Sequence, residues 1–471
     1  MSDTKDPFVP DRREFLKAAA GATVVLAQTP PLTPATGVLK PRKRSGSPTH
    51  VVVIGAGAWG GWTAWHLRKA GVKVTVVDQY GPANSRATSA DETRGIRSSY
   101  GDRAGDVGAH WTSWARSAIG RWKEFDAEWG PVFRTRFFMT TGDVICRAAE
   151  EPFTTRTREI WTKLGVQHEL LTGDEVRKRF PMMNNDDTTF ALYEPDAGVA
   201  RARASTLAVM AIAEKAGAQF RLGRIKPGPI VNNQMDGVVF DDGSVLRGDA
   251  YVFCCGAWLR KLFPQLMTNR MRVPLGYVGY FGTPVGDSRF TFPNMPSYNF
   301  PGVTGWAALP VDSRGFRVRG GIAPPAPPPP PPGSAPAAPA PPAAPAPPPD
   351  PTLSDPDLSS RQMTQARLDS TRRFIERRFP LLKDMPLLET RACHYESSVN
   401  SNFIIDHLPG TENAWIAGVG QAEGFKFGPV AGEYVAMRVL GNAGDPALVK
   451  AFKMPTEEYE VTPPRTGGDH D

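Results

Sequence analysis

The sequence predicts an α/β protein built around a buried parallel sheet, and two observations near its start lead to that class. Residues 51–54 (VVVI) are apolar and β-branched without a break, as expected for a strand that helices cover on both faces. Gly55, Gly57 and Gly60 follow at once, and after a helical stretch comes a second apolar strand at 72–77. Strand, glycine turn, helix and second strand in this order form a βαβ unit.

The glycine spacing predicts a dinucleotide site. In a GxGxxG turn the first glycine permits the bend, the second lets backbone approach a pyrophosphate, and the third lets the helix pack on the strand. The helix N-terminus directs N–H groups at the phosphates, and the acidic residue that ends the second strand can accept hydrogen bonds from ribose hydroxyls. The motif predicts a Rossmann-like domain without choosing FAD over NAD(P). Its predicted cofactor-binding residues are Gly55, Gly57, Ala58, Trp59, Gly60 and Asp78.

Composition narrows the class of partner. The chain has 471 residues, enough for two or three domains, and a net charge of +7, which is modest for this length. No nucleic-acid module is recognisable, so we expect no nucleic-acid partner. The cysteines have neither the spacing of a disulfide framework nor that of a metal site, so no metal is expected; they are Cys146, Cys254, Cys255 and Cys393.

The N-terminus predicts export. Arg12 and Arg13 precede an apolar run at 18–27, the arrangement of a twin-arginine signal peptide over residues 1–27. The run is too short to span a bilayer, so we expect no stable membrane anchor. We expect the twin-arginine translocase to carry the chain to the periplasm or beyond; the alternative is a simple N-terminal helix. Residues 28–48 are predicted to be a disordered leader.

A proline-rich segment interrupts the second half of the chain. Between residues 324 and 351, 17 of 28 residues are proline, which excludes a ladder strand or a helix interior. Strand-like and helical patterns continue on either side, so we predict an exposed insertion rather than a domain boundary. A partner that recognises proline remains an alternative role for the segment.

Several further motifs accompany the glycine turn. They are TRGIRSSYGD (93–102), YEPDAG (193–198), CGAW (255–258), CHYESSVNSNFIID (393–406) and GQAEGFKFGPVAGE (420–433). With these motifs the chain resembles the monomeric sarcosine oxidase family, within the D-amino-acid oxidase superfamily of FAD-dependent amine oxidoreductases. The resemblance covers roughly residues 49–445 and implies FAD rather than NAD.

The resemblance also implies two domains assembled from separated segments. One is the FAD domain, and the other is an α+β substrate domain with an antiparallel sheet and helices. The FAD domain is expected at about 49–138, 195–264 and 399–445, the substrate domain at about 139–194 and 265–398, and a C-terminal tail at 446–471.

Individual residues gain roles from the same resemblance. Cys393 matches a cysteine that bonds to the flavin, although a buried structural cysteine is the alternative. Arg97 and Lys426 match the pair that grips the substrate carboxylate, Arg94 a residue packed against the flavin, and Tyr395 a residue that lines the substrate pocket. The cofactor-binding residues implied beyond the glycine turn are Thr93, Arg94, Gly256, Cys393, Gly424, Phe425 and Lys426.

One departure from the family concerns the electron acceptor. Where the family has a lysine that activates oxygen, this chain has Arg317, with Arg319 as the second match. Arginine keeps the charge but cannot shuttle a proton. We expect catalysis to involve Arg317, Arg94 and Tyr395 in a monomeric enzyme that oxidises the C–N bond of a secondary or N-methyl amino acid and forms hydrogen peroxide. The alternatives are a dehydrogenase with a non-oxygen acceptor and an exported, non-catalytic flavin-binding protein.

Overall fold

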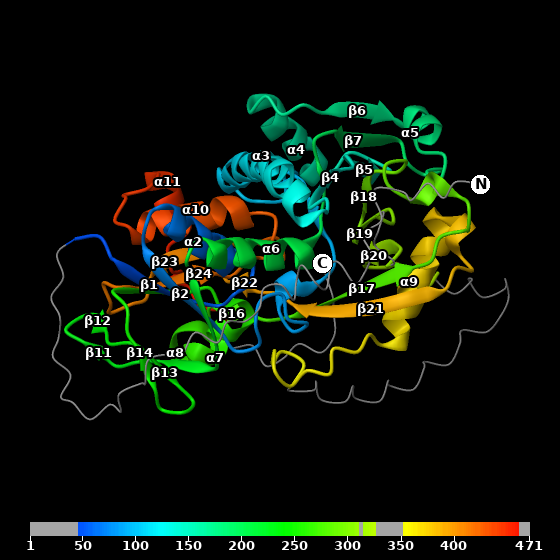
Figure 1. Cartoon of the computed structure of the whole chain (residues 1–471). Coiled ribbons are helices and arrows are strands. Elements are labelled where there is room, and N and C mark those ends of the chain that lie inside the picture. Colours follow the sequence, from blue (N-terminus) through cyan, green and yellow to red (C-terminus); the bar gives the residue numbers. More distant parts are fainter. Residues whose placement is uncertain (1–45, 310–313, 326–351, 461–471) are drawn as a thin grey trace, which may run out of the picture.

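The computed structural model describes residues 46–309, 314–325 and 352–460 (Figure 1). The predicted signal peptide and most of both the leader and the proline-rich segment lie outside the described residues. No helix in the described ranges is long and apolar enough to cross a bilayer.

A six-stranded sheet forms the first layer and carries the predicted βαβ unit. Its order is β23-β24-β15-β1-β2-β9. Each of these strands pairs in parallel with its neighbours except β23, which is antiparallel to β24. Residues 51–54 are buried, which confirms the strand predicted from their unbroken apolar run. The strands are β1 (His50–Ile54), β2 (Lys73–Asp78), β9 (Gln219–Leu222), β15 (Ala250–Phe253), β23 (Ile404–His407) and β24 (Ala414–Gly418).

Helices pack on this sheet and on one another. Helix α2 (Ala58–Lys69) contacts both α6 (Ala202–Lys215) and α10 (Gly428–Val439), and α10 also contacts α3 (Val107–Phe133). The aromatic stripe of α3 belongs to the core, because Trp111, Trp122 and Phe125 are each at most 2% exposed. Trp122 also donates a hydrogen bond from Nε1 to the carbonyl oxygen of Lys426 at 2.8 Å. The α3 stripe therefore holds the loop that leads into α10.

An eight-stranded sheet forms the second body of the fold, with strand order β21-β17-β20-β19-β18-β5-β7-β6 (Figure 1). The sequence predicts an antiparallel sheet, but the sheet is mixed, because β18 runs parallel to β5. The difference arises because these two strands come from distant segments rather than from a hairpin. The strands are β5 (Asp143–Arg147), β6 (Glu169–Thr172), β7 (Phe190–Glu194), β17 (Leu275–Phe281), β18 (Ser297–Phe300), β19 (Val303–Trp306), β20 (Phe316–Arg319) and β21 (Leu387–His394).

Two smaller, three-stranded sheets complete the fold. In the first, β3-β8-β4, the strand β8 lies between β3, which contains Arg94, and β4, which follows α3. A second, β10-β13-β14, contains the hairpin between β13 and β14. These strands are β3 (Arg94–Ile96), β4 (Phe138–Thr140), β8 (Gly198–Ala200), β10 (Ile225–Pro227), β13 (Val238–Phe240) and β14 (Val245–Leu246); the remaining longer helices are α4 (Pro152–Lys163), α5 (Gly173–Arg179) and α9 (Gln365–Arg378).

The C-terminal segment packs on the first sheet as far as the structure describes it. After α11 (Pro446–Ala451), Phe452 is only 2% exposed, and its carbonyl oxygen accepts a hydrogen bond from the N–H of Ile405 at 2.8 Å. The sequence predicts a tail from residue 446, whereas residues 446–460 belong to the fold. The segment has few apolar residues, so its sequence does not indicate that it packs on the sheet. Its packing depends on the buried Phe452.

Candidate active site

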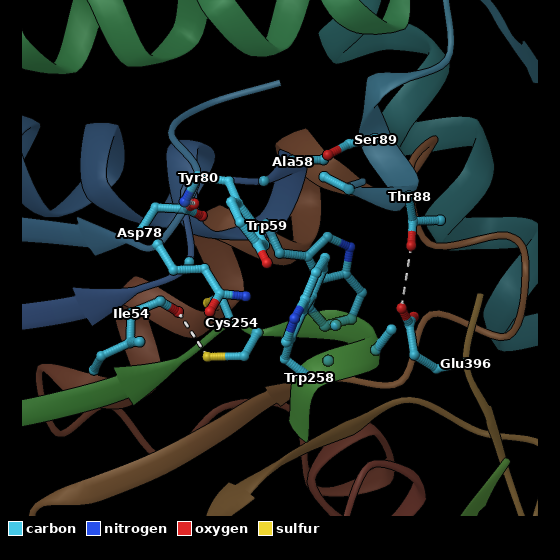
Figure 2. Close-up of a pocket in the computed structure, with 18 of the residues that line it drawn as sticks. Ile54, Ala58, Trp59, Asp78, Tyr80, Thr88, Ser89, Cys254, Trp258 and Glu396 are labelled. Carbon is cyan, nitrogen blue, oxygen red and sulfur yellow. Dashed lines mark hydrogen bonds between the residues drawn. The ribbon is translucent and has the colours of Figure 1, made fainter. Parts of the chain in front are cut away.

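A long cavity opens where β1 ends at the glycine turn (Figure 2). Gly55 lines this cavity with φ +102°, and a Cβ added to it would lie 2.4 Å from the carbonyl oxygen of Cys254. A Cβ on Gly60 would lie 1.8 Å from the carbonyl oxygen of Gly55, so Gly60 allows the close contact of helix and strand. Both positions therefore require glycine, as the sequence motif predicts.

The N-terminus of α2 forms the middle of the cavity wall. Gly57, Ala58 and Trp59 line the cavity, and Gly57 caps the helix without any side-chain hydrogen bond. The first turn contains no acidic residue, so its N–H groups and the positive end of the helix dipole remain available to an anion. This wall suits a pyrophosphate.

Asp78 lies beside this turn, at the end of β2. Its Oδ2 accepts the N–H of Ala56 at 2.8 Å, and its Oδ1 accepts the N–H groups of Tyr80 and Gly81 at 2.8 and 2.9 Å. Burial raises the pKa of Asp78, and these backbone donors counteract that rise. The fixed carboxylate keeps lone pairs for hydroxyl groups in the cavity, which fits the ribose of an adenine dinucleotide.

Asp357 closes one rim of the cavity, and sequence reasoning did not identify it. Its Oδ1 accepts hydrogen bonds from Trp258 Nε1 at 2.7 Å and Tyr80 Oη at 2.8 Å, while Lys261 Nζ lies 2.5 Å from Oδ2. The rings of Tyr80 and Trp258, both labelled in Figure 2, lie beside each other with their centroids 6.0 Å apart. An aspartate just after a proline-rich segment resembles any solvated loop residue, so no local signal marks it.

Glu396 is a second residue that the sequence did not single out. It lines the cavity while being 5% exposed, and it accepts hydrogen bonds from the N–H of Gly420 at 3.1 Å and from Thr88 Oγ1 at 3.3 Å (Figure 2). Burial raises its pKa. Glu396 therefore connects the Thr88 segment to the glycine loop before α10. In the motif at 393–406, the sequence had indicated only Cys393 and Tyr395 as site residues.

Arg94 brings a fixed positive charge to the cavity. One of its guanidinium nitrogens, Nη2, donates to the carbonyl oxygen of Thr88 at 2.6 Å and lies 3.6 Å from Cys393 Sγ. The other, Nη1, contacts the carboxylate of Asp91. Cys393 is a free, half-buried cysteine beside this group. The geometry places the proposed attachment cysteine next to a cation.

Arg317 lies behind Arg94 and shares its carboxylate. Its Nη2 is 3.4 Å from Asp91 Oδ2, and its guanidinium stacks 4.0 Å from the ring centroid of Trp306. Arg317 is 3% exposed, and its Nε has no hydrogen-bond partner. Thr93 lies in the same layer, where its Oγ1 accepts a hydrogen bond from Trp306 Nε1 at 3.0 Å. Arg317 thus reaches the cavity wall only through Asp91 and Arg94.

A second, polar cavity of about 490 Å³ lies beside Arg97 and Glu423. Arg97 Nη2 is 3.9 Å from Glu423 Oε1, and Lys426 Nζ contacts Glu423 Oε2. Lys426 also donates to Tyr100 Oη at 2.7 Å. The two cations predicted to grip a substrate carboxylate therefore converge, but an internal carboxylate lies between them. Glu423 lies within the 420–433 motif, but the sequence did not identify it as a site residue.

The predicted site residues gather around these two cavities. Arg97 lines the polar cavity, Lys426 meets it through Glu423, and Thr93, Cys393 and Arg317 lie beside or behind Arg94. Within the described residues there is no group of three or more His, Cys, Asp or Glu that could hold a metal. The predicted residues that line the long cavity are Gly55, Gly57, Ala58, Trp59, Asp78, Arg94, Gly256, Tyr395, Gly424 and Phe425.

Comparison with known families agrees with this arrangement. Residues 50–438 match a family model described as FAD dependent oxidoreductase. Over 410 residues the chain is 25% identical to monomeric sarcosine oxidase of Bacillus sp. (strain B-0618), covering 83% of this chain and 92% of that protein. It is 24% identical over 388 residues to N-methyl-L-tryptophan oxidase of Citrobacter koseri, covering 82% and 93%.

Solved structures show the same fold. L-proline dehydrogenase from P. horikoshii superposes with a TM-score of 0.67 at 21% identity, over 87% of this chain and 97% of that one. Fructosamine oxidase from Aspergillus fumigatus superposes with a TM-score of 0.68 at 20% identity, over 87% and 89%.

Proposed function

The chain belongs to the family of FAD dependent oxidoreductases, and the relatives named above are oxidases of amino acids. From this membership we propose a more specific reaction for the protein. The protein oxidises the C–N bond of a secondary or N-methyl amino acid or a derivative of one. The observation that supports this proposal is that one loop before α10 lines two cavities. Its Gly424 and Phe425 line the cavity suited to a dinucleotide, and its Glu423 lines the polar cavity that also contains Arg97.

When bound, FAD supplies the two-electron chemistry, taking a hydride from the carbon beside the amine nitrogen and passing the electrons to an acceptor. The chain's own contribution is placement. Arg97 lines the polar cavity and binds the carboxyl end of the substrate in this proposal, while Lys426 holds Glu423 beside it. Tyr395 lines the long cavity, as Arg94 does. Holding both ends of the substrate directs one C–H bond at a single point. The oxidised product then hydrolyses to an aldehyde and an amine.

Oxygen is the proposed acceptor, which gives hydrogen peroxide. A second candidate is a dehydrogenase that uses another acceptor, and Arg317 is the observation that favours it. The residue is buried against Trp306 and paired with Asp91, and arginine does not release a proton in proteins. Oxygen consumption by the reduced enzyme separates the two candidates.

The test uses the purified, FAD-containing protein. N-methyl amino acids and related secondary amines are added without oxygen, and loss of the yellow flavin absorbance is followed. We expect at least one of them to bleach the flavin. Arg97→Met is expected to weaken substrate binding and leave flavin content unchanged, because Arg97 lines the polar cavity only. A flavin that no amine bleaches would refute the proposal and favour a non-catalytic flavin-binding role.

A further inference from the structure

We propose that Glu423 determines substrate specificity by occupying the place of a substrate carboxylate, so that the enzyme prefers amines whose carboxyl group is neutralised, as in an amide. The inference rests on the proposed function and narrows it. Its basis is the position of the Glu423 carboxylate, which touches Lys426 Nζ with one oxygen and lies 3.9 Å from Arg97 Nη2 with the other.

The Glu423 carboxylate is ionised at neutral pH. Burial alone would raise the pKa of Glu423, but Lys426 and Arg97 outweigh this effect and lower the pKa to about 2. Its side chain is a quarter exposed and lines the polar cavity, so it faces an entering ligand. Any carboxylate that approaches the same two cations therefore meets a fixed negative charge at close range.

The two cations differ in how many hydrogen-bond and ion-pair partners they already have. Lys426 is 3% exposed, and its ammonium has both Glu423 and the hydroxyl of Tyr100 as partners. Arg97 contacts Glu423 through an ion pair of 3.9 Å, and its side chain remains 19% exposed. Arg97 can thus donate hydrogen bonds to a neutral carbonyl oxygen, whereas Lys426 offers little to a second anion.

The polar cavity has room for the group that replaces the free carboxylate. It holds about 490 Å³ and is lined by donors and acceptors from several elements. Its lining includes Asp102, Glu151 and Asn299, whose side-chain oxygens can accept hydrogen bonds. An amide nitrogen or a short extension beyond it would find polar partners there, so the cavity suits an amidated or otherwise extended amine.

The size of the preference follows from the charges. Two unit charges about 4 Å apart at an effective dielectric near 20 repel enough to change an equilibrium by roughly 1,000-fold. Glu423 is partly exposed, so solvent reduces this effect, and we expect on the order of 100-fold. Removing the charge should therefore raise the affinity for carboxylates strongly and change that for neutral amides little.

The experiment compares N-methylglycine with N-methylglycinamide as reductants of the FAD-containing protein, in the wild type and in Glu423→Gln. We expect the variant to raise the ratio of kcat/KM for the acid over the amide by about 100-fold. Glu433→Gln removes an equal charge from an exposed position on α10 that pairs with Arg121, so it serves as the matched control. An unchanged or lowered ratio in Glu423→Gln would overturn the inference.

A second measurement keeps this test separate from that of the proposed function. Acetate, which cannot be oxidised as an amine, is titrated into both proteins while the flavin absorbance spectrum or the binding heat is recorded. Tighter acetate binding by Glu423→Gln supports the inference, and equal or weaker binding overturns it. If neither amine reduces the flavin in any variant, the proposed function fails, while the acetate result still decides the role of Glu423.

Discussion

Asp91 is the carboxylate on which two buried arginines depend, and Asp91→Asn tests this directly. Asp91 is 1% exposed and contacts both Arg94 and Arg317, with a further hydrogen bond from Tyr280 Oη at 2.8 Å. Asparagine keeps the shape but removes the charge. Two guanidinium groups would then lie close together in the interior without a counter-ion, and breaking a buried ion pair in this way costs about 3–5 kcal/mol.

The pKa of Asp91 gives a second measure of how much its ion pairs stabilise the folded protein. Burial by itself raises this pKa, but Arg94 and Arg317 outweigh burial and lower it from an ordinary 3.8 to about 2. A difference of nearly two units corresponds to about 2 kcal/mol of folding free energy. Because the folded-state pKa is the lower one, this stabilisation is complete above about pH 4 and disappears as the pH falls through about 2. The two figures agree in order of magnitude.

Urea unfolding of the two proteins, followed by tryptophan fluorescence from pH 7 down to pH 3, provides the assay. At neutral pH we expect Asp91→Asn to lower the free energy of unfolding by about 2–5 kcal/mol and to reduce the amount of FAD incorporated, since Arg94 loses its anchor. The gap between the proteins should narrow below pH 4. Asp384→Asn, at an exposed position, is the matched control. A variant as stable as this control, or a gap that stays constant with pH, would refute the reasoning.

Three further predictions concern attachment, the acceptor and export. Cys393→Ser is expected to abolish yellow colour in the acid-precipitated polypeptide, and colour that persists would exclude attachment through this sulfur. Arg317→Lys is expected to speed the reaction of reduced enzyme with oxygen on the order of tenfold while flavin reduction by substrate changes less, measured by stopped-flow absorbance. Replacing Arg12 and Arg13 together by lysine is expected to stop export, and an unchanged amount of exported protein in cell fractions would contradict a twin-arginine signal.

The sequence predicts the parts of this protein that local chemistry determines. The apolar run before Gly55 could form only a covered strand, and the positive φ of that glycine allows the turn that the motif requires. Asp78 was predicted from its place after the glycine turn, but Asp91, Asp357 and Glu423 were not. Asp357 meets Trp258 across 99 residues. Asp91 and Glu423 each have one cation three residues away, but the second cation that each one binds, Arg317 or Arg97, comes from a distant segment. An acidic residue in a loop has the same local pattern whether it faces solvent or neutralises a buried cation.

These carboxylates change how the charge of the site should be understood. Arg94 and Arg317 share Asp91, while Lys426 and Arg97 share Glu423. Each pair of cations therefore shares an internal counter-ion, which fixes its position and reduces the field that a ligand meets. The buried carboxylate of Asp143 also interacts with Arg97 and Lys426.

The same pairing limits which groups can change charge near neutral pH. Asp91 and Glu423 both have a pKa of about 2, and arginine does not deprotonate in proteins. Neither carboxylate can then produce an acid limb in the pH dependence of flavin reduction above about pH 4. Two groups remain that could produce such a limb: the amine, which must be unprotonated at nitrogen to give up a hydride, and Glu396, whose pKa burial raises. A limb that belongs to the amine should shift with the pKa of the amine when the substrate is changed, whereas a limb that belongs to Glu396 should stay in place.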